Sequence, residues 1–156
     1  MEGNPDRTFT VARVVPAPRE TVFRAWTRPA ELEKWWSIGE GWKTRSAEVD
    51  LRAGGKFSLL NEPLGGDAVM LTGEFLAVEP PQKLVYTWRF PGIGPKASTI
   101  TVEFRDLGPQ TEVAVTHAHA SQEMIPGAIE GWEAALAGLL VFLSRLPKAR
   151  HDSPVL

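Results

Sequence analysis

A long apolar stripe near the end of the chain follows a stretch of β-type sequence. Its members recur at helical spacing and are Ala128, Trp132, Ala135, Leu136, Leu139, Leu140, Leu143 and Leu146. An amphipathic helix of this length must bury its apolar face against another layer of structure. Pro147 ends the stripe because proline cannot continue a helix. The sequence therefore predicts one long helix that starts near either Ser121 or Gly127 and packs across a sheet.

Short segments that alternate between apolar and polar residues supply this sheet. We predict strands at residues 9–15, 44–50, 56–61, 68–78, 83–90, 98–105 and 111–119. Their short connections indicate an antiparallel meander. Gly73 lies inside one of these segments, which predicts a bulge or the close approach of another element.

Two short helices, at residues 19–28 and 30–36, are predicted between the first and second strands. The fold class is thus α+β, with a curved seven-stranded antiparallel sheet and a carboxyl-terminal helix across it. A curved sheet closed by a single helix leaves a space between the two layers, and such a space is the natural ligand site.

Composition narrows the class of protein. A chain of 156 residues is long enough for one domain with its own core. The absence of cysteine excludes disulfides, thiolate metal sites and a cysteine nucleophile. With a net charge of −2, the chain shows no excess of basic residues of the kind that binds nucleic acid. No signal peptide and no membrane-spanning stretch are apparent, so we expect a cytoplasmic protein without membrane insertion.

Tryptophan is concentrated early in the chain. The sequence holds six tryptophans, and four of them lie between positions 26 and 42. Each indole needs both a large space and a partner for its N–H, so this concentration predicts a thick aromatic core or the wall of a cavity. The adjacent Trp35 and Trp36 are expected to diverge, with one in the core and the other at the cavity mouth or the surface.

An ordered set of motifs resembles the START-like (helix-grip, SRPBCC) superfamily over residues 7–146. The motifs include Val22-Phe23-x-Ala25-Trp26-Thr27-x-Pro29, Trp35-Trp36, Gly54-Gly55, Pro80-Pro81 followed by Leu84-Val85-Tyr86-Thr87-Trp88, and Gly131-Trp132. The most similar branch is the stand-alone bacterial relatives of the heat-shock chaperone ATPase activator. The resemblance implies a single helix-grip domain with flexible termini at 1–6 and 147–156. It also implies an internal cavity for small hydrophobic molecules, which fold analogy alone does not convert into a reaction.

His117 is the most informative polar residue of the predicted sheet. It shares a strand face with Val113, Val115 and His119. The functional interpretations are a ligand hydrogen bond, a general base or a metal pair. The structural interpretation is a core histidine satisfied by a backbone carbonyl, with His119 exposed. No third metal ligand lies nearby in the sequence, and we predict neither metal nor cofactor.

Arg13 has the strand parity of Phe9 and Val11, so it either points inward or reaches solvent from an edge strand. An inward guanidinium would need ligand oxygens or a carboxylate, for which Glu48, Asp50 and Glu74 are candidates. The complete predicted ligand-binding set is His117, Trp88, Tyr86, Trp132, Trp35, Arg13, Phe57, Phe75 and Leu136, and no residue is assigned as catalytic.

Three functions remain open. The leading one is binding of a small hydrophobic molecule, aromatic, polyketide-like or lipid-like, in the internal cavity without catalysis. The second is a cyclase, dehydratase or hydrolase that uses His117 as an acid or base. The third is a stress-response or chaperone-associated interaction protein with an exposed patch formed by Trp36, Ile38 and Trp42, which a homodimer could also use.

Overall fold

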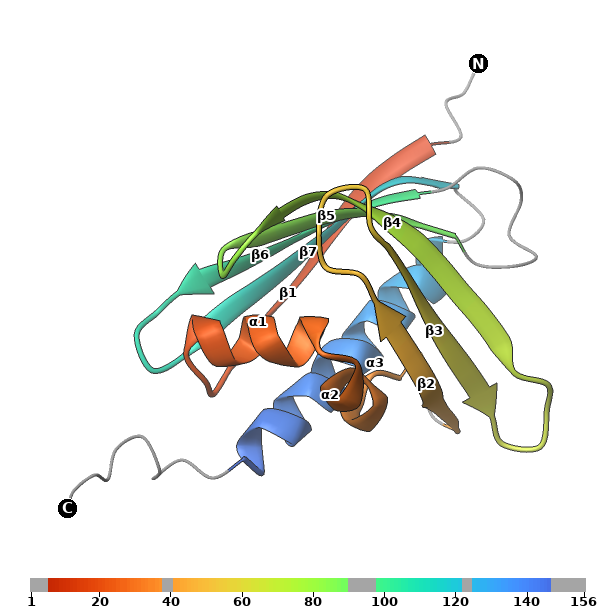
Figure 1. The fold of residues 1–156 in the computed structure, drawn as a ribbon, viewed down its shortest axis with the longest axis horizontal. Coiled ribbons are helices and arrows are strands. Elements are labelled where there is room, and N and C mark those ends of the chain that lie inside the picture. Colours follow the sequence, from red (N-terminus) through yellow and green to blue (C-terminus); the bar gives the residue numbers. More distant parts are fainter. Residues whose placement is uncertain (1–5, 38–40, 90–97, 122–124, 147–156) are drawn as a thin grey trace.

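The computed structural model describes residues 6–37, 41–89, 98–121 and 125–146, and it contains one curved sheet and three helices (Figure 1). In chain order the elements are β1 (Asp6–Val15), α1 (Arg19–Thr27), α2 (Pro29–Trp35), β2 (Trp42–Val49), β3 (Lys56–Pro63), β4 (Val69–Glu79), β5 (Lys83–Trp88), β6 (Ser98–Asp106), β7 (Thr111–Ser121) and α3 (Ile125–Ser144). The predicted order of elements is confirmed.

All seven strands belong to one sheet in the order β1-β7-β6-β5-β4-β3-β2, and every neighbouring pair is antiparallel. The sheet curls, and all three helices lie on its concave side (Figure 1). The predicted α+β class, with a long terminal helix across a curved antiparallel sheet, is confirmed.

The two short helices are separated by one residue, Arg28, which precedes a proline. Pro29 disfavours helical torsions in the residue before it, and Arg28 is extended with φ −92 and ψ 125. Pro29 itself fits the first position of α2, where no hydrogen bond from its nitrogen is needed. The chain therefore turns between α1 and α2 without losing the apolar face that each helix buries.

Helix α3 begins at Ile125, between the two predicted starts, with Pro126 in its first turn. The predicted apolar stripe is the buried face: Trp132, Ala135, Leu136, Leu139 and Leu143 are in the core. By length and composition alone, the segment Gly127–Ser144 could cross a membrane, with a mean hydropathy of 1.3. Because Trp132, Leu136, Leu139 and Leu143 pack beneath the sheet, α3 is the core helix of this fold.

Gly73 of β4 confirms the predicted close approach. A Cβ atom at this position would lie 2.0 Å from the backbone oxygen of Thr87 and 2.5 Å from the ring of Phe57. No side chain fits there, so glycine is required where β4 passes between its two neighbours.

The surface alternative for one of the adjacent Trp35 and Trp36 is wrong, since both are buried, at 3% and 4% exposure. Helix α2 ends at Trp35, and Trp36 follows in an extended conformation with φ −66 and ψ 131. This change of torsion turns the second indole towards the core as well. Trp36 therefore cannot contribute to an exposed patch; Trp42 is half-buried, and Ile38 lies outside the described residues.

Candidate functional site

Five tryptophans from four parts of the chain meet on the concave side of the sheet. We call this group the tryptophan cluster: Trp26, Trp35, Trp36, Trp88 and Trp132. Trp36 is central, with ring centroids 5.5 Å from Trp35, 5.6 Å from Trp88 and 5.5 Å from Trp132. These three contacts are edge-on, a favourable geometry for aromatic pairs. Helices α1, α2 and α3 thus converge with β5 on one aromatic region.

The indole N–H groups of the cluster differ in their partners. Trp35 donates to the backbone oxygen of Ala25 at 2.8 Å, and Trp26 donates to the Tyr86 hydroxyl oxygen at 3.4 Å. The indole nitrogen of Trp36 is buried and has no hydrogen-bond partner among the residues that the structure describes. An unpaired buried donor costs about 1–3 kcal/mol, so Trp36 retains a polar group that a ligand atom could satisfy.

His117 lies on β7 and is completely buried. Its Nδ1 accepts a hydrogen bond from the Trp132 indole at 3.0 Å, and its ring lies 5.1 Å from that of Phe9. Burial lowers the pKa of His117 to about 4, so the imidazole is neutral at pH 7. Because Nδ1 accepts, the hydrogen-bond network assigns the proton to Nε2, which is buried and has no partner in the described part of the chain.

This arrangement revises the interpretations of His117. Its partner is an indole rather than the backbone carbonyl of the structural interpretation. The lone pair that a general base would use is already occupied, and the free nitrogen offers only a donor. The side chain of His119, the other half of the suggested metal pair, lies outside the described residues.

A small void of about 20 Å³ lies beside the cluster, between α1, α2 and strands β2 to β5. It is lined by Trp26, Leu32, Trp36, Val49, Phe57, Leu59, Phe75, Tyr86 and Trp88. A volume of this size holds about one water molecule and is far below the several hundred Å³ of typical ligand pockets. Burial raises the pKa of Tyr86, a residue that lines the void, so its hydroxyl stays protonated.

The predicted site residues fall into three groups. Phe57, Phe75, Tyr86 and Trp88 line the void. Trp35, Trp132, Leu136 and His117 are core residues that do not line it. Arg13 is exposed, so the inward alternative is wrong for this residue: β1 is an edge strand, where a long side chain can reach solvent despite its parity.

Sequence reasoning missed five residues that line the void: Trp26, Leu32, Trp36, Val49 and Leu59. Trp26 and Leu32 carried a usable signal, since each lies on the predicted apolar face of a short helix. Trp36 did not, because its orientation depends on the torsion angles that end α2.

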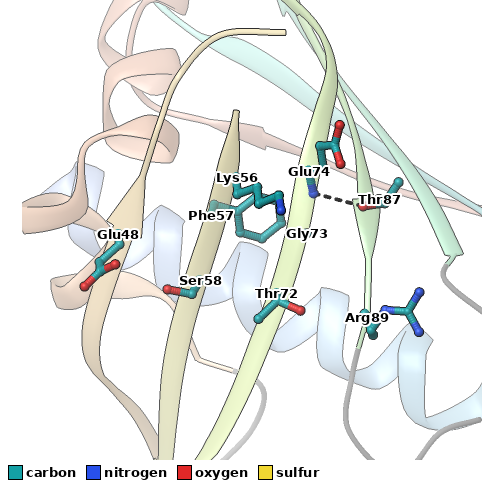
Figure 2. A pocket seen from close by; sticks show the side chains of 9 residues that line it. All are labelled: Glu48, Lys56, Phe57, Ser58, Thr72, Gly73, Glu74, Thr87 and Arg89. Atoms are coloured by element: carbon teal, nitrogen blue, oxygen red, sulfur yellow. Dashed lines mark hydrogen bonds between the residues drawn. The ribbon is translucent and has the colours of Figure 1, made fainter. Parts of the chain in front are cut away.

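A larger hollow lies on the opposite, convex face of the sheet, with a volume of about 440 Å³. Figure 2 shows its polar side chains, among them Glu48, Lys56 and Thr72, in front of the strands and α3 behind them. Phe57 borders both this hollow and the void on the concave side. This residue is therefore shared by the linings of the two hollows.

Solved structures similar to this chain share its fold over nearly its whole length. Protein CV1439 from Chromobacterium violaceum is 26% identical with a TM-score of 0.80, covering 90% of this chain and 98% of that one. PFC0360w from Plasmodium falciparum, described as an HSP90 activator, is 29% identical with a TM-score of 0.69 and covers 88% and 96%. CalU16 from Micromonospora echinospora is 28% identical, also with a TM-score of 0.69, and covers 90% and 78%.

A search of curated proteins found no match. The family model described as "Activator of Hsp90 ATPase homolog 1-like protein" matches residues 16–144, which run from the end of β1 to the end of α3. The chain therefore belongs to the family of Activator of Hsp90 ATPase homolog 1-like proteins.

Proposed function

We propose that this protein binds a small apolar molecule, aromatic in character, against the tryptophan cluster on the concave side of the sheet. The observation that carries the proposal is a void lined by aromatic side chains, two of which retain an unused hydrogen-bond donor. Among the described residues, the Trp36 indole N–H has no partner, and the Tyr86 hydroxyl accepts a bond from Trp26 but donates none.

The size of the void determines how such a ligand would enter. About 20 Å³ does not admit a molecule of several rings, so binding must displace side chains that now fill the space. Trp88 is the candidate to move, because it is only half-buried while Tyr86, Phe57 and Phe75 beside it are buried. Stacking and apolar burial of about 25 cal/mol per Å² would supply the affinity.

Titration of the intrinsic tryptophan fluorescence tests the proposal, with fluorene and anthracene as planar probes and decanoate as a lipid-like probe. We expect the planar probes to quench the fluorescence and raise the melting temperature. Quenching and stabilisation by none of the three probes would contradict the proposal.

Two leucine truncations give a matched comparison. Leu59→Ala enlarges the void, whereas Leu139→Ala removes a similarly buried side chain from the α3 face, away from the void. Each should cost about 2–5 kcal/mol of stability, but only Leu59→Ala should tighten the binding of fluorene. Equal effects of the two truncations would show that the probe binds elsewhere.

A second candidate function is association with a chaperone. The likeness to PFC0360w, described as an HSP90 activator, favours it. A direct binding measurement with purified Hsp90 tests this candidate, and the absence of binding at micromolar concentrations would remove it.

A further inference from the structure

Trp36 combines two properties that no other residue in the described part of the chain shares. It lines the void beside the tryptophan cluster, and its buried indole nitrogen has no hydrogen-bond partner among the described residues. A buried polar group without a partner is rare in folded proteins, and each one requires a physical reason. The other such groups belong to Arg19, Asn61 and His117, and none of these residues lines the void. The donor that a ligand of the void would meet is therefore that of Trp36.

The contacts around Trp36 fix where its indole lies. Its backbone N–H donates to the Leu32 oxygen at 2.9 Å, and its backbone oxygen accepts from the Thr44 hydroxyl at 2.8 Å. Its ring packs edge-on against Trp132 and Trp88. Because the indole is held in this way, its N–H need not reorganise when an acceptor arrives. Trp88 is the half-buried side chain proposed to move, so the space that it vacates lies beside Trp36.

The polar side chains of the lining define what kind of group could satisfy this donor. The indoles of Trp26, Trp36 and Trp88 can only donate. The one side-chain acceptor among the described lining residues is the Tyr86 hydroxyl oxygen, which already accepts from Trp26. A water or an alcohol would therefore bring a hydrogen for which the lining side chains offer only that occupied oxygen. An ionised carboxylate would be costly, because the described lining includes no basic residue to compensate its charge.

We propose that the ligand carries a neutral oxygen that only accepts hydrogen bonds, the carbonyl of a ketone or quinone, and that this oxygen binds the indole N–H of Trp36. This inference rests on the proposed function, since it concerns a ligand of the same void. The class of ligand is therefore a planar apolar molecule with a carbonyl group, and the hydrogen bond to Trp36 selects it over the corresponding hydrocarbon or alcohol.

The test compares 9-fluorenone, 9-fluorenol and fluorene, which share their ring skeleton and differ at one carbon. We expect the wild-type protein to bind fluorenone roughly tenfold more tightly than fluorene by calorimetry, which corresponds to one net hydrogen bond. Fluorenol carries an oxygen on the same carbon but also a hydrogen that needs an acceptor. It should therefore bind more weakly than fluorenone.

Two tryptophan variants assign the preference to one indole. In Trp36→Phe the ratio of fluorenone to fluorene affinity should fall to about one while fluorene still binds. Trp35→Phe is the matched control, because Trp35 is equally buried, does not line the void and already donates its indole N–H to the Ala25 oxygen. It should keep the preference for fluorenone. Since both variants lose the same atoms, a difference between their ratios reports the free N–H and not the loss of ring area.

Each other outcome has a definite meaning. Equal binding of fluorenone and fluorene by the wild type would overturn the carbonyl inference and leave the proposed function standing. Fluorenol bound as tightly as fluorenone would overturn the restriction to a group that only accepts. A preference that survives in Trp36→Phe, or that Trp35→Phe loses as well, would overturn the assignment to Trp36. Binding of none of the three probes would contradict the proposed function, and the inference would fall with it.

Nitrogen-15 NMR of the indole N–H groups in the wild-type protein provides a readout that does not depend on the folding of a variant. An N–H proton moves downfield when it gains a hydrogen-bond acceptor. We expect the Trp36 indole proton to move further downfield with fluorenone than with fluorene, whereas the Trp35 indole proton should respond alike to both. An equal response of the Trp36 signal to the two probes at saturation would overturn the proposal.

Discussion

At Gly138, α3 lies against the end of α2, and replacement of this glycine by alanine tests the packing next to the tryptophan cluster. A Cβ at this position would lie 2.6 Å from the backbone oxygen of Trp35. A real Cβ does not come so close, so backbone would have to move. Alanine gains about 1 kcal/mol over glycine in helix propensity, whereas overpacking of a core typically costs about 1–3 kcal/mol.

The backbone contact should outweigh the propensity gain, because the atom in the way is a carbonyl oxygen and not the end of a flexible side chain. We expect Gly138→Ala to lower the free energy of unfolding by about 1–2 kcal/mol in urea titrations. It should also change the fluorescence of the cluster, since Trp35 and Trp36 are in ring contact.

Gly127→Ala is the control in the same helix. A Cβ at Gly127 meets no atom within 4 Å, so this variant should be neutral or more stable by up to about 1 kcal/mol. Equal or greater stability of Gly138→Ala relative to the wild type would refute the argument that the end of α2 leaves no room for a Cβ atom at position 138.

Three further predictions concern other contacts. The pKa of His117 is about 4 in the folded protein and ordinarily 6.5, so the unfolded chain binds the proton first as the pH falls. The contribution of the neutral His117 side chain to stability is therefore complete above pH 6.5 and is lost as the pH falls towards 4. Relative to His117→Phe, the wild type should lose up to about 3 kcal/mol over this range in urea titrations, and a constant difference would contradict the buried neutral imidazole. Thr44→Val removes the hydroxyl that donates to the Trp36 backbone oxygen at 2.8 Å and should cost about 1 kcal/mol, while an unchanged melting temperature would show that this bond does not anchor Trp36. The Ala47 N–H on the edge strand β2 donates to the Glu33 carboxylate at 3.0 Å, and Glu33→Ala frees this N–H. Light scattering should then show increased self-association of the variant. A monodisperse variant would argue that Glu33 does not protect the sheet edge.

The fold was predictable because its elements have distinct periodicities. Alternation marked the strands, the helical stripe marked α3, and prolines marked where α1 begins and where α1 gives way to α2. The site was only partly predictable. Strand parity assigns Arg13 to one face of the sheet but does not tell how much of that edge strand the helices cover. The direction of Trp36 depends on one pair of torsion angles after α2, and the volume left between packed rings depends on every rotamer around it.

The position of Phe57 has a consequence for access to the interior. Because its ring borders hollows on both faces of the sheet, and Gly73 beside it has no side chain (Figure 2), one phenyl group limits the size of both. Shortening this side chain should widen the two hollows together, and a soluble quencher such as acrylamide should then reach the indoles more readily without any helix moving.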